Sequence, residues 1–201
     1  MKNKIKSIVV VSSLLLGSTT FADENFYSQT KSLVGIEGGY SSVDYEYGVR
    51  TSNTQGSVSL ENVGLKIGAE SEDFRIFLSG AYFFDSGSQY DYLTTYGLAI
   101  QYKFNVSKVL NFYLGANAGL MNAKVRAKNS SGVPETFSRT FSDPYFGGDL
   151  GANIHLGDAV DLELGGRVMS VQADNTQGGV TYRIGNIVQG YGSLIFKWQM
   201  D

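Results

Sequence analysis

The 201-residue chain contains no cysteine, only two prolines and a single histidine. Without cysteine there can be no disulfide framework, no thiolate metal site and no lipid attachment to an N-terminal cysteine. One histidine leaves oxygen atoms as the main metal ligands, and the acidic residues Asp44, Glu46, Glu135, Asp143 and Asp174 lack the spacing of a calcium loop. We therefore expect no metal and no cofactor, and any anchoring must come from the fold itself.

The chain also lacks an apolar run long enough to cross a bilayer as a helix. Its apolar segment Ile8–Leu16 is about half of the ~20 residues required. Three lysines precede this segment, and Thr20-Phe21-Ala22 follows as an acceptable cleavage site. These features favour a cleaved signal peptide, residues 1–22, over a transmembrane helix, and they leave residues 23–201 as one domain.

Cleavage would remove three of the 16 basic residues and none of the 19 acidic ones, which leaves 13 minus 19, a formal charge of −6. An acidic chain is a poor partner for nucleic acid, so we expect none.

From Leu33 to Trp198 the chain alternates apolar with small or polar residues over about ten positions and then breaks into a turn. In residues 62–69 the odd positions are aliphatic, whereas the even positions carry Asn62, Gly64, Lys66 and Gly68. This pattern is typical of strands that face lipid on one side and a polar lumen on the other. Eight such strands are predicted: Leu33–Ser42, Ser57–Ala69, Phe74–Phe84, Tyr92–Phe104, Asn111–Asn122, Tyr145–Leu156, Asp161–Val171 and Ile187–Trp198.

The third of these strands alternates least cleanly, because Phe77 and Phe83 fall on its inward face beside Arg75 and Ser79. Aromatic residues gather at the strand ends and predict two interfacial girdles. Their members are Tyr40, Tyr82, Phe84, Tyr92 and Phe146 at one interface, and Phe74, Tyr102, Phe104, Phe112, Phe196 and Trp198 at the other.

Short and long connections alternate along the chain, as they do in barrels with periplasmic turns and extracellular loops. The short turns are Glu70–Asp73, Asn105–Leu110 and Gly157–Val160, and the longer loops are Asp44–Gln55, Asp85–Asp91, Lys124–Asp143 and Gln172–Gly185. Both prolines, Pro134 and Pro144, fall in or beside the longest loop, where a missing N–H breaks no strand ladder.

The pattern therefore predicts an all-β protein, an eight-stranded antiparallel up-and-down transmembrane β-barrel. The competing architecture is a soluble sandwich or lipocalin-like barrel, which points its apolar face inward. Mid-strand lysines and glutamates on a glycine-rich polar face, opposite aliphatic rows, favour lipid on the outside.

On these residues the chain resembles the small outer-membrane barrels of the OmpA and OmpX type. The alternating Leu194, Phe196 and Trp198 of its last strand are similar to the C-terminal signal of that family, although Gln199, Met200 and Asp201 trail beyond it. The resemblance implies a Gram-negative outer membrane with both termini periplasmic, and a chain that is inserted by the barrel-insertion machinery and surrounded by lipid and lipopolysaccharide. It also implies a monomer, with host or surface ligands as candidate partners of the loops.

Six inward charges form the candidate interior network: Glu37, Lys66, Arg75, Asp149, Glu163 and Arg167. They could line a channel or pair with one another. The interior of an eight-stranded barrel is about filled by its own side chains, so we favour a structural network. Within it, we expect Glu37 to bond Lys66 on the adjacent strand.

No catalytic constellation is evident. His155 faces the lumen beside a periplasmic turn, far from the outer leaflet and loops where barrel enzymes work. Tyr45, Tyr47 and Tyr90 are candidate contacts for a protein partner. We therefore expect a non-enzymatic protein that contributes to envelope structure and binds through its loops. The alternatives are a small porin-like channel and, less favoured, an enzyme that modifies lipid A.

Overall fold

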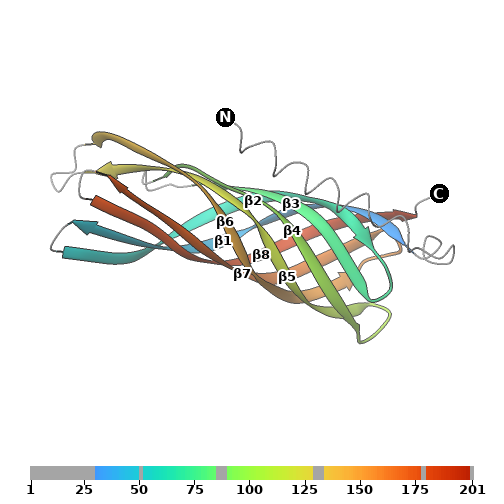
Figure 1. Ribbon diagram of the computed structural model, residues 1–201. Helices are drawn as coiled ribbons and strands as arrows, with labels where there is room; N and C mark the ends of the chain where they lie inside the picture. Colours follow the sequence, from blue (N-terminus) through green and yellow to red (C-terminus); the bar gives the residue numbers. More distant parts are fainter. Residues whose placement is uncertain (1–29, 50–51, 85–89, 129–133, 178–179, 200–201) are drawn as a thin grey trace, which may run out of the picture.

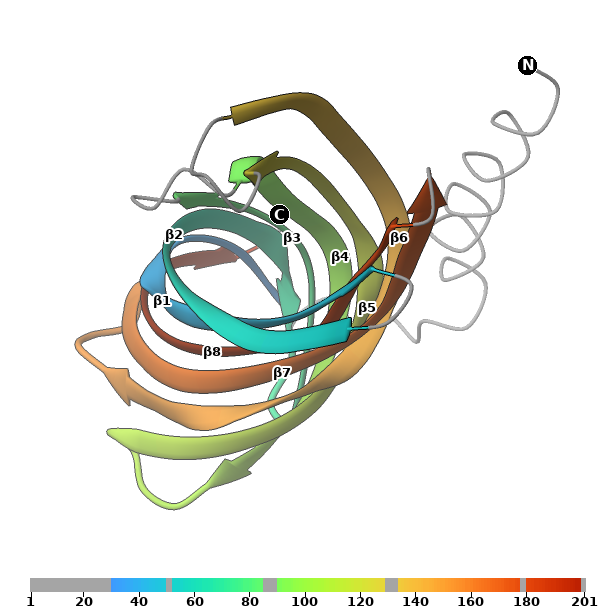
Figure 2. The same ribbon diagram turned by 90° about the vertical axis from the view of Figure 1, so that its left-hand side faces the viewer.

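The computed structural model describes residues 30–49, 52–84, 90–128, 134–177 and 180–199. They form eight antiparallel strands: β1 (Lys31–Val49), β2 (Ser52–Glu70), β3 (Phe74–Phe84), β4 (Tyr90–Asn105), β5 (Leu110–Lys128), β6 (Pro134–His155), β7 (Val160–Gln177) and β8 (Val180–Gln199). Each strand pairs with the next, and β8 pairs with β1, so the sheet closes into a barrel (Figures 1 and 2). The predicted eight-stranded barrel is confirmed.

Closure is what makes this sheet compatible with a bilayer. β1 pairs with β2 on one side, beginning at Lys31↔Glu70, and with β8 on the other, beginning at Lys31↔Gln199. Neither side of β1 is therefore left as an edge. In hydrocarbon every backbone N–H and C=O needs an internal partner, and a closed barrel supplies one for each strand. Within the described part of the chain, no helix is long and apolar enough to cross a membrane. The expected signal peptide lies outside the described residues.

The two faces of the sheet carry opposite chemistry, as the alternation predicts. On β2, the outward Leu65 and Ile67 are 63% and 60% exposed, whereas Lys66 between them is 1% exposed. On β3, Phe74, Ile76 and Leu78 are exposed while Arg75 and Phe77 are buried, which confirms the side-chain directions predicted for the least regular strand. An apolar exterior around a polar interior rules out the soluble-barrel alternative, and the protein is a transmembrane β-barrel.

The predicted aromatic girdles lie on the outer face of the barrel. At the end with the short turns, the exposed rings include Phe74, Tyr102, Phe104, Phe196 and Trp198. Phe74 packs edge-on against Tyr102, and Tyr102 packs against Phe104, with centroids 5.0 and 4.9 Å apart. At the opposite end, which we call the long-strand end, Tyr40, Tyr82, Phe84 and Phe146 are exposed, while Tyr92 is half-buried.

Three of the predicted long loops are wrong in extent, because strands occupy most of them. β1 and β2 pair as far as Val49↔Ser52, β7 and β8 as far as Gln177↔Val180, and β5 and β6 as far as Lys128↔Pro134. Beyond the membrane the outward positions become polar, so the lipid-type alternation fades although the backbone pairing continues. Figure 1 shows these extensions at its left side.

The placement of the prolines in a loop is also corrected. Pro134 begins β6, and Pro144 lies inside it, paired with Leu120 of β5. The β6–β7 pairing starts only at Tyr145↔Val171, so β6 has one described neighbour at Pro144. Proline is tolerated in a strand that forms an edge, because a missing N–H there interrupts no second ladder.

The extensions separate into two units at the long-strand end. β7, β8, β1 and β2 stay paired and form a four-stranded sheet, which we call the protruding sheet: residues 44–49, 52–60, 172–177 and 180–186. β5 and β6 form a separate two-stranded arm, residues 124–128 and 134–144. In Figure 1 the arm, in olive and yellow, lies apart from the teal and red strands of the sheet.

Candidate functional site: the barrel lumen

All six residues of the expected network point into the lumen. Glu37 comes from β1, Lys66 from β2, Arg75 from β3, Asp149 from β6, and both Glu163 and Arg167 from β7. Their exposure ranges from 0% for Glu163 to 6% for Arg167. They occupy inward positions because each lies at an even spacing from the other polar or small residues of its strand.

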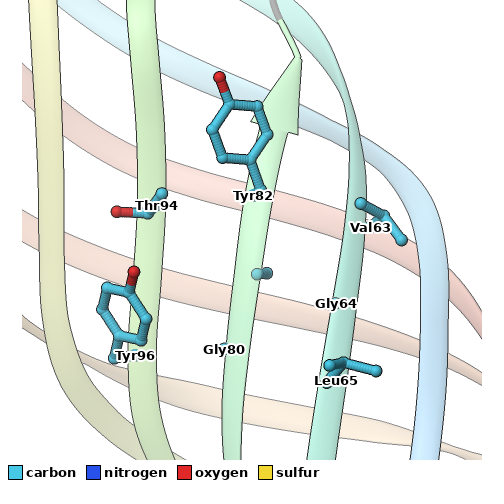
Figure 3. Close-up of a pocket in the computed structure, with 8 residues that line it drawn as sticks. Val63, Gly64, Leu65, Gly80, Tyr82, Thr94 and Tyr96 are labelled. Carbon is cyan, nitrogen blue, oxygen red and sulfur yellow. The ribbon is translucent and has the colours of Figure 1, made fainter.

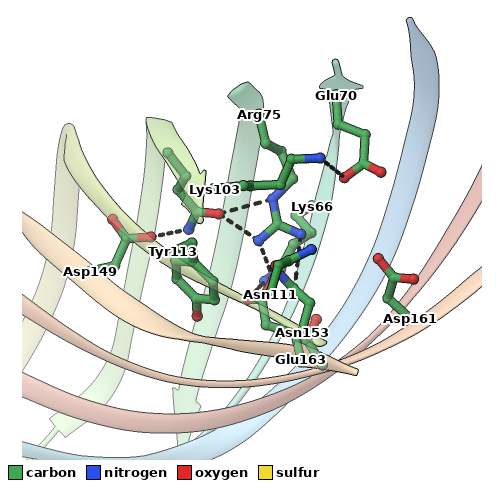
Figure 4. Close-up of polar contacts among 12 residues, drawn as sticks. Lys66, Glu70, Arg75, Lys103, Asn111, Tyr113, Asp149, Asn153, Asp161 and Glu163 are labelled. Atoms are coloured by element: carbon green, nitrogen blue, oxygen red, sulfur yellow. Dashed lines mark hydrogen bonds and ion pairs between the residues drawn. The ribbon is translucent and has the colours of Figure 1, made fainter. Parts of the chain in front are cut away.

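Five of the six residues are joined by ion pairs. Lys66 Nζ lies 3.0 Å from Glu37 Oε2 and 2.9 Å from Glu163 Oε1. Arg75 Nη2 lies 2.6 Å from Glu163 Oε2 (Figure 4). Arg167 Nη1 lies 3.2 Å from Glu37 Oε1. The Glu37–Lys66 contact expected between neighbouring strands is therefore present, and Lys66 also reaches across the lumen from β2 to β7.

Amide side chains, which were not among the predicted members, complete this network. The Gln101 amide donates to Asp149, which has no cation within ion-pair distance among the described residues, and Arg75 donates to the Gln101 carbonyl. Gln189 donates to Glu37 at 2.9 Å, and Arg75 Nη1 lies 3.4 Å from Asn153 Oδ1. The sequence places these glutamine and asparagine residues on the inward face. Alternation alone does not predict which of them hydrogen-bonds to a charged side chain.

A second cluster lies nearer the short turns. Lys197 Nζ lies 2.8 Å from Asp161 and 3.0 Å from Glu70, and Lys103 lies 3.6 Å from Glu70. His155 Nδ1 lies 2.7 Å from Asp161 Oδ1. The sequence predicts Glu70 in a turn, but Glu70 ends β2 and is 7% exposed inside the barrel. Pairing with Arg75 and Lys31 extends β2 to this position.

Tyrosine rings fill the space between the charges. The Tyr113 and Tyr191 hydroxyls lie 2.8 Å apart at the centre of the lumen. The Lys66 ammonium and the Arg167 guanidinium lie 4.9 and 4.8 Å from the centre of the Tyr191 ring, a cation–π geometry. Gly165 makes room for both tyrosines, since a Cβ there would collide with their hydroxyl ends.

Towards the long-strand end the lumen changes to apolar. Twelve buried side chains form one cluster, which we call the apolar plug: Val43, Leu60, Phe83, Leu93, Met121, Ala123, Tyr145, Met169, Val171, Ala173, Ile184 and Ile187. Ten of them are 0–1% exposed, so their side chains are packed together across this level of the lumen. Most of its members lie within the predicted strands, whereas Ala173 and Ile184 lie in the predicted loop Gln172–Gly185.

The balance of lumen charges decides what the site can do. The ion-pair network with Asp149 carries three acids and three bases, and the second cluster carries Glu70 and Asp161 against Lys103 and Lys197. The lumen charge therefore sums to zero, and each acid has a bonded partner. Two buried atoms, Asn117 Oδ1 and Arg167 Nε, lack a hydrogen-bond partner among the described residues. This arrangement of paired charges stabilises the interior of the barrel.

His155 is held by an acid and an amide. Its Nδ1 contacts Asp161 and its Nε2 lies 3.0 Å from the Asn111 amide, beside the β6–β7 turn. In the described part of the chain, no group of three or more His, Cys, Asp or Glu residues could hold a metal ion.

The candidate partner contacts lie on strands and not in irregular loops. Tyr45 belongs to the extended part of β1 and stacks on Tyr182 of β8, with ring centroids 6.2 Å apart and an interplanar angle of 3°. Tyr47 lies on β1 and Tyr90 begins β4, but their side chains are outside the described part of the structure. The extension of β1 and β4 beyond the predicted bounds explains this correction.

No family model matches the chain, and no curated protein matches it in sequence. Solved structures do match. Neisserial surface protein A (NspA) aligns with a TM-score of 0.59 at 17% identity, over 82% of this chain and 97% of that one. The outer membrane protein OprG from Pseudomonas aeruginosa aligns with a TM-score of 0.51 at 14% identity, over 89% and 100% of the two chains. The protein has the fold of the small eight-stranded outer-membrane β-barrels.

Proposed function

We propose that the protein is a non-enzymatic outer-membrane barrel, closed to solutes, that binds partners at the cell surface through its protruding sheet. One observation carries the proposal. On β2, pairing with β3 ends at Glu61↔Phe84, whereas pairing with β1 continues to Val49↔Ser52. Residues 52–60 therefore form a strand edge beyond the membrane with no described partner on one side.

An edge with no partner among the described residues favours strand addition. Its backbone N–H and C=O groups can pair with an extended segment of another chain. The edge Ser52–Leu60 contains no charged residue and no proline, which are the usual devices that block such pairing. The corresponding edge of β6 carries both, with Glu135, Arg139 and Pro144.

The two faces of β2 set the preference of the partner. Inward Leu60 is buried in the apolar plug and Val58 packs against it, whereas Ser57 and Ser59 are exposed on the outer face. A segment added beside β2 would place alternate side chains next to Val58 or next to the serines. We therefore infer a partner segment with alternating apolar and polar residues.

A lysine-flanked peptide of about ten alternating valine and threonine residues, long enough to span the edge, tests this binding mode. We expect it to slow amide hydrogen exchange of residues 52–60 in the refolded barrel. Ser59→Lys should abolish this protection, because a charge on an edge blocks pairing. Asn186→Lys is the control, since Asn186 is exposed on β8, which has neighbours on both sides. Equal protection in both variants would contradict strand addition.

Channel activity is the alternative, and the filled lumen argues against it. The apolar plug and the neutral ion-pair network occupy successive levels of the interior. We expect no steady conductance in planar bilayers, and no change when Glu163→Gln or Arg167→Gln removes a lumen charge. Conductance that changes with either substitution would favour the channel.

An enzyme that modifies lipid A is less favoured, because His155 lies at the short-turn end and has Asp161 and Asn111 as its partners. We expect unaltered lipid A in cells with and without the gene.

The remaining features of the proposal follow from the barrel geometry. The apolar belt contacts lipid and lipopolysaccharide, and β8 presents Leu194, Phe196 and Trp198 outward for the insertion machinery. Closure of β8 on β1 leaves the barrel wall without an edge that requires a second copy, which supports a monomer.

Both ends of the described chain lie with the short turns, which we assign to the periplasm. Residues 1–22 are the proposed signal peptide.

A further inference from the structure

A groove of about 520 Å³ crosses the outer wall of the barrel over β2, β3 and β4 (Figure 3). Gly80 occupies an outward position on β3, between Leu78 and Tyr82, and pairs with Leu65 on β2 and Tyr96 on β4. Because Gly80 has no side chain, the backbone forms the floor of the groove there. Leu65, Tyr82 and Tyr96 stand around this floor.

The groove lies at membrane depth. Tyr96 is six residues along β4 from Tyr102 of the girdle at the short-turn end, which is roughly 20 Å along the strand and about 15 Å of height at ordinary strand tilt. The apolar band of such barrels is about 25 Å tall, so the groove falls within the half nearer the long-strand end. Water does not fill a groove at this depth, and its occupant must be lipid or protein.

The lining joins an apolar part to a polar part. Val63 and Leu65 are aliphatic and exposed, whereas Tyr96 carries a hydroxyl that points along β4 towards Thr94. In the described part of the chain, no hydrogen bond reaches the hydroxyl of Tyr82 or Tyr96. Thr94 Oγ1 donates only a long bond, 3.5 Å, to the Asn122 carbonyl. Hydroxyls without partners are costly in hydrocarbon, so an oxygen supplied by the occupant would stabilise them.

We propose that this groove binds one acyl chain of a membrane lipid. The chain lies over Gly80 beside Leu65, and an ester, amide or hydroxyl oxygen near its head bonds the Tyr96 and Thr94 hydroxyls. A lipid fits better than a second barrel. The Tyr82 and Tyr96 rings stand above the floor, so they would hold a second barrel wall away from Gly80, whereas a single flexible chain can enter between them.

Photolabelling tests the proposal on the refolded barrel in nanodiscs of phosphatidylcholine that carries a diazirine in the middle of one acyl chain. Mass spectrometry locates the labelled residues. We expect label concentrated on residues 63–65, 80–82 and 94–96, relative to the rest of the apolar belt. In Gly80→Leu the added side chain fills the floor, and the label at these residues should be lost. The nearest atom to a Cβ at Gly80 is Tyr96 Cδ1 at 3.4 Å, so a slight turn of that ring accommodates the change.

Gly190→Leu is the matched control, because Gly190 faces outward on β8 and a Cβ there has no described atom within 4 Å. It should leave the groove label unchanged, and heat-dependent gel mobility verifies that both variants are folded. Tyr96→Phe should lower the label without abolishing it, and full labelling would contradict the role of the hydroxyl. Label spread evenly around the wild-type belt, label retained in Gly80→Leu, or barrel-to-barrel cross-links through the groove would each overturn the proposal.

Discussion

At the scale of single residues, the lumen shows how buried charge is kept in an eight-stranded barrel. Glu37 and Glu163 share Lys66, and each acid also has an arginine, Arg167 or Arg75. A charged side chain is costly to bury without an opposite charge beside it, so the loss of one member leaves the charge of its partner buried and unpaired. The network therefore stabilises the closed interior as a unit.

Glu37→Gln and Lys66→Met, made singly and together, should show this interdependence. We expect a coupling free energy of unfolding of about 0.5–3 kcal/mol, because the two charged atoms lie 3.0 Å apart with both side chains buried. Urea unfolding from lipid vesicles measures it. As a control, Glu37→Gln combined with Glu72→Gln, at an exposed turn acid, should be additive. Additive effects of Glu37→Gln and Lys66→Met would remove the pair from the account.

Glycine at inward positions is required by close approach of neighbouring strands. A Cβ at Gly147 would overlap the Val168 carbonyl group on β7, with its carbon 2.8 Å away. We expect Gly147→Ala to destabilise the barrel by about 1–3 kcal/mol, the usual cost of overpacking, in the same urea assay. Gly190→Ala places its methyl group outward in open space and should not destabilise. Equal effects of the two substitutions would be inconsistent with the packing described.

The residue contacts could be predicted from the sequence only in part. Glu37 and Lys66 were expected to pair because they lie inward on strands that are neighbours in sequence. The contact of Lys66 with Glu163 joins β2 to β7 across the lumen, and it depends on the tilt and stagger of the strands, which alternation does not specify. The Gln101 contacts with Arg75 and Asp149 depend on the same geometry.

At the scale of elements, strand identity and facing were predictable, whereas strand length was not. Alternation of aliphatic and polar residues marks a strand only where one face meets lipid. Beyond the membrane, Ser57, Ser59 and Asp44 occupy outward positions, so the signal ends before the pairing does. The protruding sheet was not predicted for this reason.

The two extended units approach each other where β6 and β7 stop pairing. Asp143 on β6 lies there, beyond the membrane, and Asp174 lies on β7. Partial burial and the nearby Asp174 carboxylate raise the pKa of the Asp143 carboxyl above its usual 3.8. The folded arm thus holds this proton more tightly than the unfolded arm. The stability of the folded arm therefore falls as the pH rises from 3.8 through the raised pKa of Asp143, and it stays lower at higher pH.

Asp143→Asn removes that penalty, so we expect slower amide exchange in residues 134–144 than in the wild type near neutral pH. The two proteins should become alike below pH 3.8, where the aspartate is protonated in both states. Asp158→Asn, in the exposed turn between β6 and β7, is the control. It should leave the amide exchange of residues 134–144 unchanged both near neutral pH and below pH 3.8. Faster exchange in Asp143→Asn at neutral pH would mean that the ionised Asp143 stabilises the arm, which would contradict the account.

At the scale of the whole molecule, the barrel divides into three levels along its axis. A charged and amide-rich interior lies towards the short turns, an apolar plug follows, and the protruding sheet and the β5–β6 arm extend beyond. The first two fill the lumen with buried side chains, so we expect the chemistry that is accessible to other molecules on the outer wall and at the long-strand end. This division supports a role in binding at the surface over a role in transport.

We assign the long-strand end to the outside of the cell. Protease sites inserted separately in residues 129–133, between β5 and β6, and in residues 106–109, between β4 and β5, test it on intact cells. We expect cleavage only at the first site, with heat-dependent gel mobility of the intact protein. Cleavage only at the second site would reverse the orientation, and a protein found soluble in periplasmic extracts would contradict the membrane barrel itself.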